Sequence, residues 1–256
     1  MRMGCFTQHY SWKEIKDLYE LTARKPALAM RPRFKICPAS MIDTVRPVDG
    51  KRVFEPMRWG LVPNWWQLGI EPTNPAAFNT HVDTVATISF FRCSFQRRHC
   101  LIPASGYYQW QDTPDGRQPY YFTRRDGCVM TIAGLWDEWR HPDTQQLTRS
   151  CTMMIGASNK FAEVRGQMPV ILEPGQFAAW LSAEAGLKVP QPAGEALLCK
   201  HPVSRRLNRS RASDTDATLI EKVALPAGCS LDARPAIAVD VASSVGDRAN
   251  SAVGNG

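Results

Sequence analysis

The stretch that most constrains this chain runs from Arg97 to Trp110, where two bases lead into an apolar run, a Pro-Ala-Ser-Gly turn and several aromatics. The pattern predicts a strand that enters a tight turn at Gly106 and a second strand that begins at Tyr107. A turn preceded by bases and flanked by aromatics is suited to a flat anionic ligand such as an unstacked nucleotide. The same residues also suit an ordinary β-hairpin of a mixed sheet, so both interpretations stay open.

Capping and turn signals place further elements around this stretch. Ser11 and Glu14 match a capping box, which predicts an amphipathic helix that ends before Pro26. Residues 90–98 predict a short basic helix beside the central strand. Two Asp-Gly pairs are hairpin signals that predict more strands. They are Asp115-Gly116, between strands at 107–111 and 119–123, and Asp126-Gly127, before a strand at 129–133.

Two adjacent tryptophans, Trp65 and Trp66, stand at the start of a long loop that runs to about residue 77. A connection of this length in a compact domain is usually functional or disordered. Neighbouring residues cannot both face one side of a strand, so one indole is expected to be exposed. Whether that indole stacks on a nucleic acid or packs against the protein stays open.

Charge and cysteine usage limit the class of protein. Lys and Arg exceed Asp and Glu by 31 to 24, a net charge of +7, which suits an anionic partner but also serves solubility. The eight cysteines contain no Cys-x-x-Cys pair, so we expect neither a zinc or redox site nor a cofactor. No apolar run approaches the roughly 18 residues that span a bilayer, and the first residues lack a signal core. We therefore expect an intracellular, cytoplasmic protein with no membrane partner.

From Pro226 onward the chain contains Ala, Gly, Ser and Val with scattered charges and no aromatic residue. Such a segment buries too little apolar surface to offset its chain entropy. We therefore expect one domain over residues 1–225 and a disordered tail over 226–256.

Five short blocks, taken in order, resemble the SRAP family, the SOS-response-associated peptidases or abasic-site-processing proteins. The blocks are Trp59–Trp65, Phe78-Asn79, Pro103–Trp110, Ala133–Trp136 and Met168–Leu172. The resemblance implies a single α+β domain with a curved, largely antiparallel β core and peripheral helices. It also implies a monomer that binds single-stranded or gapped DNA at abasic sites.

The family's chemistry, as the resemblance implies it, depends on a cysteine directly after the initiator methionine. Its amine and thiol close on the aldehyde of a ring-opened abasic sugar to form a thiazolidine crosslink. A glutamate before the tryptophan of the turn and a histidine before the Pro-Val run transfer protons. An asparagine and an arginine hold the deoxyribose and the phosphate.

The family's chemical positions are substituted in this chain. Aligned on Phe6, the cysteine position holds Met3, and the nearest thiol is Cys5, inside the chain and without a neighbouring free amine. Gln109 stands at the glutamate position and Arg165 at the histidine position, and neither is a general base at neutral pH. We expect Met1 to be retained, because its removal requires a small second residue and Arg2 is large.

The residues that the resemblance implies for DNA binding are better preserved. Asn79 is kept, while His81 replaces the phosphate-binding arginine and exchanges a bidentate cation for an imidazole. Two further bases and two aromatics complete the candidate DNA-binding set. They are Arg97, Arg98, Trp65 and Trp110.

Three hypotheses follow, and they leave enzymatic activity open. The first is a catalytically impaired SRAP-like protein of the DNA-damage response that still binds single-stranded DNA at abasic sites. The second is an active abasic-site processor that uses Cys5, or Gly4 exposed by internal initiation at Met3. The third is a non-catalytic scaffold that binds a partner other than DNA.

Overall fold

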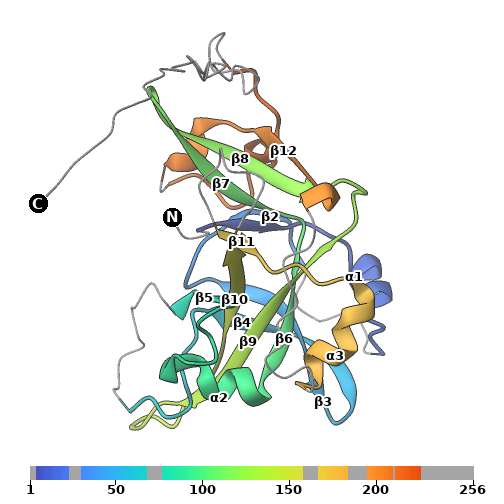
Figure 1. Ribbon diagram of the computed structural model, residues 1–256, viewed down its shortest axis with the longest axis vertical. Coiled ribbons are helices and arrows are strands. Elements are labelled where there is room, and N and C mark those ends of the chain that lie inside the picture. The colour runs from blue at the N-terminus through green and yellow to red at the C-terminus, as the bar shows by residue number, and fades with distance from the viewer. Residues whose placement is uncertain are drawn as a thin grey trace, which may run out of the picture. The chain divides into compact units, whose positions relative to one another are not determined.

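Two β-sheets make up most of the regular structure in the computed structural model (Figure 1). The structure describes residues 4–22, 30–67, 77–157, 167–183, 195–209 and 211–225. Arg165 and the predicted tail, 226–256, lie outside these residues. Met1–Ala224 forms one compact unit.

Sheet A contains five antiparallel strands in the order β12-β8-β7-β1-β2. Their bounds are β1 Phe6–Gln8, β2 Arg33–Ile36, β7 Gly106–Thr113, β8 Gly116–Arg124 and β12 Leu198–Pro202. The hairpin predicted at Asp115-Gly116 is confirmed, because Thr113 pairs with Gly116 where β7 turns into β8. Gly116 has a φ of +101°, a conformation that glycine adopts without strain.

Sheet B closes into a five-stranded barrel in the order β10-β4-β3-β6-β9, with β9 paired back to β10. The short strands β5 and β11 extend it along β10. The bounds are β3 Met41–Val48, β4 Lys51–Trp59, β5 Asn79–His81, β6 His99–Ala104, β9 Met130–Arg140, β10 Leu147–Ala157 and β11 Gln167–Pro169. Only the pairings of β10 with β4 and β5 are parallel, so the largely antiparallel α+β core is confirmed.

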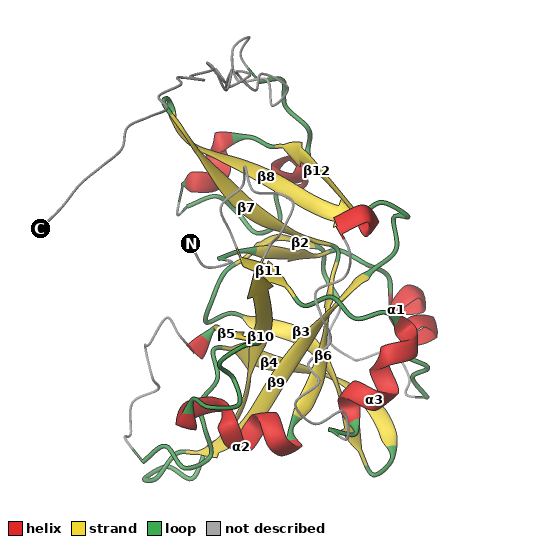
Figure 2. Ribbon diagram, viewed as in Figure 1, coloured by secondary structure: helices red, strands yellow, loops and turns green. Residues whose placement is uncertain are grey.

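Short helices lie around the strands (Figure 2). The α-helices are α1 Trp12–Leu18, α2 Ser89–Arg97 and α3 Phe177–Leu181, and the 3₁₀ turns are η2 Pro174–Gln176, η3 Glu195–Leu197, η4 Arg205–Asn208 and η5 Ala217–Ile220. The capping box at the start of α1 is confirmed: Ser11 and Glu14 exchange side-chain to backbone hydrogen bonds. The basic helix predicted at 90–98 is confirmed as α2.

Two predicted hairpins are wrong, because each chain turn passes from one sheet to the other. β6 belongs to sheet B and β7 to sheet A, although only Ser105 separates them. Likewise β8 lies in sheet A and β9, after the turn at Asp126-Gly127, in sheet B. The apolar run of β9, buried on both faces over its first six residues, suits a barrel strand better than an edge hairpin.

Each face of sheet B carries buried side chains, and one face joins sheet A. One face packs with α1 and α3 in a core that includes Val45, Leu101 and Met154. On the other face Trp59 meets Phe6 of β1 edge to face, with ring centroids 5.2 Å apart. The two sheets therefore share a core through the side of β1 that carries Phe6.

Candidate functional site

Gln109 lies on β7 where the two sheets meet. Its side chain is 5% exposed, and its Nε2 donates to the backbone carbonyl of Gln167 on β11 at 2.9 Å. Its Oε1 is buried and accepts no hydrogen bond from the described residues. A side-chain amide exchanges no proton near neutral pH, so Gln109 offers a hydrogen-bond acceptor rather than a base.

Strand register places three polar side chains on one face of sheet B. Asn79 and His81 of β5 pair with β10 from one side, and Gln167 of β11 pairs with it from the other. Residues that alternate along a strand or pair across it share a face, so the three face away from the helix-covered side that carries Met154. The structure therefore places Asn79 and His81 on the same face as Gln167, to which Gln109 is hydrogen-bonded.

His81 is held by its own loop. Its Nδ1 lies 3.3 Å from the Asp83 backbone N–H, which donates to it, and 3.2 Å from Asp83 Oδ2. About a quarter of the imidazole is exposed. Asp83 supplies a carboxylate next to the imidazole, a partner that the sequence analysis did not identify. Arg165, two residues before Gln167 in the chain, lies outside the described residues.

The structure does not bring Cys5 together with Gln109. Cys5 comes just before β1, and the register of β1 with β7 places it beside Tyr108 on the face opposite Phe6 and Gln109. There it joins an apolar cluster with Tyr108, and its Sγ lies 2.9 Å from Cys37 Sγ. The hydrogen bond with Cys37 and burial raise the pKa of the Cys5 thiol, so Cys5 is a poor nucleophile in this environment.

Trp110 lies on the same side of sheet A as Cys5. Its Nε1 donates to Asn208 Oδ1 at 2.6 Å, and the guanidinium of Arg117 lies 5.8 Å from the ring centroid. Trp110 therefore belongs to the surface formed with η4, whereas Asn79 and His81 face the other side of sheet A. The candidate DNA-binding residues thus fall on more than one surface.

Arg98 forms an ion pair with Asp137, and its guanidinium also lies over the ring of Trp136. The Asp137 side chain is 1% exposed and also accepts from the Asn64 N–H and the Ser94 hydroxyl. Its position ties α2, β9 and the loop after β4 together. The Arg98 charge is therefore largely offset within the protein, whereas Arg97, next to it, is exposed.

The tryptophan pair has one exposed member, as expected. Trp65 is 46% exposed, and its ring centroid lies 6.1 Å from those of both Trp66 and Phe90. Trp66 is less exposed, and its carbonyl accepts from Trp139 Nε1 at 2.6 Å. Trp65 thus offers an aromatic surface supported from behind by Phe90 of α2.

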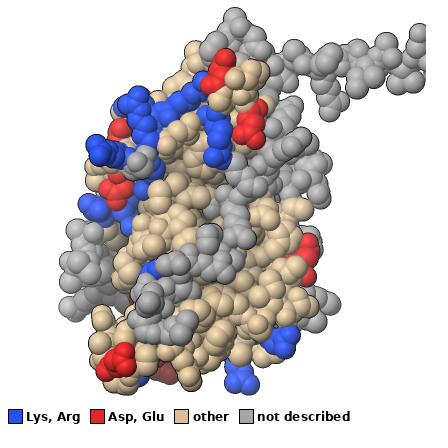
Figure 3. All heavy atoms as spheres, turned by 90° about the vertical axis from the view of Figure 1, so that its left-hand side faces the viewer, with Lys and Arg blue, Asp and Glu red and all other residues tan. Residues whose placement is uncertain are grey.

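The sequence analysis missed a group of arginines after β12. Figure 3 shows Lys and Arg side chains gathered near the top of the face on the left of Figure 1. The sequence after β12 carries four exposed arginines, at 205, 206, 209 and 211. Four bases in seven residues are a signal for nucleic-acid contact that could have been recognised.

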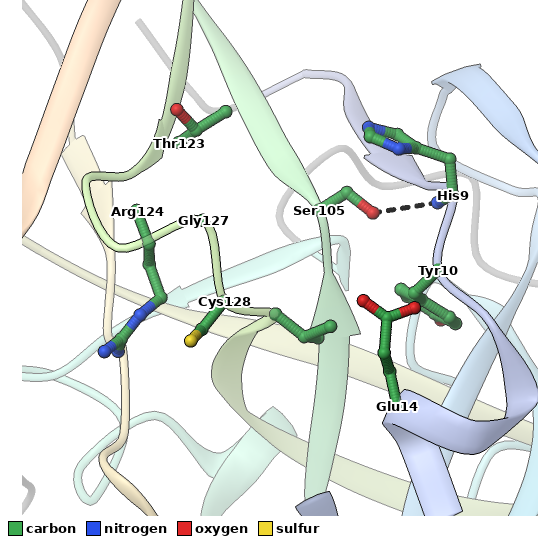
Figure 4. A pocket seen from close by; sticks show the side chains of 9 residues that line it. His9, Tyr10, Glu14, Ser105, Thr123, Arg124, Gly127 and Cys128 are labelled. Carbon is green, nitrogen blue, oxygen red and sulfur yellow. Dashed lines mark hydrogen bonds between the residues drawn. The ribbon is translucent and has the colours of Figure 1, made fainter.

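A cavity of about 360 Å³ opens on another part of the molecule (Figure 4). His9, Ser105 and Arg124 are among its lining residues, and the His9 N–H donates to Ser105 Oγ at 2.8 Å. Burial lowers the pKa of His9. Arg124 is already paired with Asp126 and Glu173. The cavity contains none of the residues that the sequence analysis named as a site.

Two further classes of site are not found in the described part of the chain. No group of three or more His, Cys, Asp or Glu side chains there is placed to hold a metal ion. None of its helices has the length and apolarity needed to cross a membrane.

Known proteins resemble this chain in both sequence and fold. The abasic site processing protein YoqW of Bacillus subtilis is 25% identical over 181 residues, 70% of this chain and 80% of that protein. HMCES of Xenopus tropicalis, also named an abasic site processing protein, is 29% identical over 193 residues, 64% of this chain and 56% of its own length.

Among solved structures, a protein of Bacteroides thetaiotaomicron has a TM-score of 0.69 at 20% identity, over 86% of this chain and all of its own. A Bordetella bronchiseptica protein has a TM-score of 0.67 at 23% identity, over 78% of this chain and 99% of its own. The model of the SOS response associated peptidase family, SRAP, matches residues 3–210. That match spans most of the chain and both sheets, and the chain belongs to the SRAP family.

Proposed function

We propose that this protein binds single-stranded DNA at abasic sites and that its covalent chemistry is impaired. The surface that carries Asn79 and His81, next to Gln109, receives the lesion. Trp65 stacks on a neighbouring base, and Arg97 contributes positive charge. Relatives named abasic site processing proteins support the choice of ligand.

The observation that carries the proposed impairment is the environment of Gln109. Its amide nitrogen is committed to the Gln167 carbonyl, and its buried Oε1 is left as an acceptor at the sheet junction. Such a site orients a hydroxyl or an N–H group of a ligand but moves no proton. Binding can persist on this surface while the proton transfers of thiazolidine formation are lost.

Cys5 does not offer an alternative nucleophile in this arrangement. Its thiol is buried on the far side of sheet A and hydrogen-bonded to Cys37. To reach a sugar next to Gln109, the side chain would have to move through the sheet, which would break the pairing of β1 with β7. The proposal therefore assigns Cys5 no part in crosslinking.

A second candidate function, imine formation by an amine at Gly4, rests on one specific observation. β1 and β7 are antiparallel, with Phe6 opposite Tyr107, so continuing that register places Gly4 opposite Gln109. An N-terminal amine at Gly4 would stand beside the proposed lesion site and attack an aldehyde there; loss of water would give an imine that borohydride reduces. Without an adjacent thiol the product would not close to a thiazolidine.

The crosslinking experiment separates these functions. Purified protein, with its N-terminus established by intact mass, is incubated at neutral pH with a single-stranded oligonucleotide that contains one abasic site. We expect no crosslink that survives denaturation without borohydride. A restored variant lacks residues 1 and 2, begins Met-Cys-Gly-Arg, and carries Gln109→Glu and Arg165→His; we expect it to crosslink. Equal crosslinking by the unaltered protein would overturn the proposed impairment.

The binding experiment tests the DNA partner independently of chemistry. Anisotropy of a labelled single strand that contains a stable abasic analogue is measured over a range of salt concentrations. We expect log affinity to fall with log salt by about 0.7 per neutralised phosphate. Trp65→Ala should weaken binding by about 1–3 kcal/mol, the value of one stacked base.

Two control variants sharpen the binding experiment. Trp65→Phe retains an aromatic face, so we expect it to keep most of the affinity. Leu147→Ala shortens another exposed apolar side chain and should change little. The scaffold hypothesis instead predicts no salt-dependent DNA binding by any of these proteins, and that result would exclude the proposed function.

A further inference from the structure

Cys5, just before β1, and Cys37, just after β2, lie opposite each other where these antiparallel strands pair. Phe6 of β1 pairs with Ile36 of β2, so Cys5, one residue before, faces Cys37, one residue after. Cross-strand neighbours of this kind place their Cβ atoms about 4.5–5.5 Å apart. The two sulfurs are 2.9 Å apart as free thiols, held by a thiol–thiol hydrogen bond.

The two thiols differ in a way that assigns each a role. Cys37 is partly exposed, whereas Cys5 is buried. The hydrogen bond with Cys5 and the nearby charge of Lys35 lower the pKa of Cys37, and the same hydrogen bond together with burial raises the pKa of Cys5. Thiolate character and access decide which cysteine reacts first, so Cys37 is the attacking sulfur and Cys5 the second.

We propose that Cys5 and Cys37 are a modification site at which a peroxide converts the two thiols reversibly into a disulfide. In the first step the Cys37 thiolate attacks one peroxide oxygen and the O–O bond breaks. Cys37 becomes a sulfenic acid, and the other oxygen departs as hydroxide. In the second step the sulfur of Cys5, losing its proton, attacks Cys37 Sγ. The S–O bond breaks, water leaves, and the S–S bond forms. The thiols lose two electrons and the peroxide gains them.

The geometry requires only a small movement. A disulfide needs a sulfur–sulfur separation of about 2.05 Å, so the sulfurs must approach by less than an ångström. The pair lies on the edge of an apolar cluster with Tyr108, Val203 and Leu207, which leaves Cys37 as the accessible member. This thiol–thiol hydrogen bond has no counterpart among the other cysteines that the structure describes.

The disulfide would act on the start of the chain. It would link the residue before β1 to the residue after β2, next to Gly4, which the register of β1 with β7 places opposite Gln109. Linking residues 5 and 37 restricts the unfolded chain, so the oxidised protein should unfold at a higher temperature than the reduced protein. The inference concerns thiol chemistry alone and does not depend on DNA binding.

Mass spectrometry of the full chain tests the proposal directly. Reduced protein is treated with one equivalent of hydrogen peroxide, quenched by alkylation, and digested without reductant. We expect intact protein to lose two hydrogen atoms, a peptide pair joined through Cys5 and Cys37, and recovery of both thiols with dithiothreitol. Over-oxidation of Cys37 without a link, or a link that uses other cysteines, would overturn the proposal.

Variants provide matched controls. Cys37→Ser and Cys5→Ser should each abolish the loss of two hydrogens, whereas Cys93→Ser and Cys128→Ser, which remove exposed thiols, should retain it. If a serine variant at 5 or 37 fails to fold, the peptide map of the unaltered protein still decides. Persistence of the linked form in a folded Cys37→Ser protein would contradict the assignment.

Discussion

Single buried side chains hold several elements of this protein together. Asp137 is the clearest case, because four groups converge on a carboxylate that is 1% exposed: the Arg98 guanidinium, the Ser94 hydroxyl and the amides of Asn64 and Glu138. Removing the carboxylate leaves all four groups without their acceptor, which costs more than the hydrogen bonds themselves contribute. Arg98 therefore has a structural role that its place in a basic run does not reveal.

Replacing Asp137 tests this role. We expect Asp137→Ala to lower the free energy of unfolding by about 2–4 kcal/mol, because it leaves the Arg98 charge, one third exposed, without a counterion and three donors without an acceptor. Denaturant titration measures the loss. Asp112→Ala is the control, since the Asp112 ion pair with Arg117 is exposed and long, at 3.7 Å; a change below about 0.5 kcal/mol is expected there. Equal effects of the two substitutions would contradict the role.

At the scale of elements, close packing decides how strands change sheets. Gly106 begins β7 where the chain leaves the barrel for sheet A, and a Cβ there would lie 2.5 Å from the Tyr121 ring and 2.6 Å from the Phe122 carbonyl. The backbone carbonyl belongs to the neighbouring strand and cannot move aside cheaply. Glycine at this position is required by contact rather than by a positive φ.

Gly106→Ala should therefore destabilise the protein. We expect a loss of about 1–3 kcal/mol, typical of an extra methyl group in a packed site, and a lower thermal midpoint by differential scanning fluorimetry. Gly175→Ala is the matched control, because nothing lies within 4 Å of its Cβ position. If both variants unfold at the same temperature as the unaltered protein, the strands tolerate more separation than the structure implies.

His99 joins three elements and should make stability depend on pH. It lies on β6, where its Nδ1 is 2.6 Å from the Trp180 carbonyl and its Nε2 is 2.6 Å from the Phe95 carbonyl. Its ring stacks on that of Trp180 with centroids 4.0 Å apart. Burial lowers the pKa of His99 below its ordinary value of 6.5 and outweighs the hydrogen bonds to the two carbonyls, which act in the opposite direction. The unfolded chain then binds this proton more readily than the native protein, so the stabilisation is present above pH 6.5 and is lost as pH falls through the lowered pKa.

Comparison with His99→Phe isolates this contribution. Phenylalanine keeps an aromatic ring against Trp180 but carries no titrating group. We expect the free energy of unfolding of the unaltered protein to fall more steeply between pH 7 and acid pH than that of the variant, as urea titrations at several pH values would show. Parallel pH curves would assign the effect to other groups, such as His9, whose pKa is also lowered by burial.

At the scale of the whole molecule, the two sheets of the described domain share a core rather than forming separate units. Phe6 of sheet A packs on Trp59 of sheet B. Gln8 Nε2 of β1 lies 3.0 Å from the Pro103 carbonyl, to which it donates, and 3.2 Å from that of Asp43. Both contacts join the short strand β1 to the barrel. A strand of three residues has little stability of its own, so β1 depends on both sheets.

We therefore expect the two sheets to unfold in one transition. Tryptophan fluorescence and far-UV circular dichroism should give the same denaturant midpoint, the signature of a two-state process. Phe6 is fully buried, so Phe6→Ala should lower the free energy of unfolding by about 3–5 kcal/mol. The denaturant midpoint should then fall by the same amount for both probes. Separate midpoints, or a loss confined to one probe, would show that the sheets are independent.

The sequence by itself determined the local elements, because their signals lie within a few residues of each other. The capping box of Ser11 and Glu14, the basic helix α2 and the hairpin at Asp115-Gly116 are examples. The five ordered blocks identified the SRAP family and, through the resemblance, the mixed fold with its antiparallel core. The positions of the candidate site, from Asn79 to Gln109, came from the same blocks.

Only the tertiary structure decided which strands pair and which faces meet. Strand alternation states that neighbouring residues point to opposite sides, but the partner strand is chosen by contacts far apart in the chain. For that reason the predicted hairpins between β6 and β7 and between β8 and β9 were wrong. For the same reason Cys5 and Gln109 lie on opposite faces of sheet A. The same reason applies to Arg98, whose partner Asp137 is 39 positions away and is brought to it by the pairing of β6 with β9.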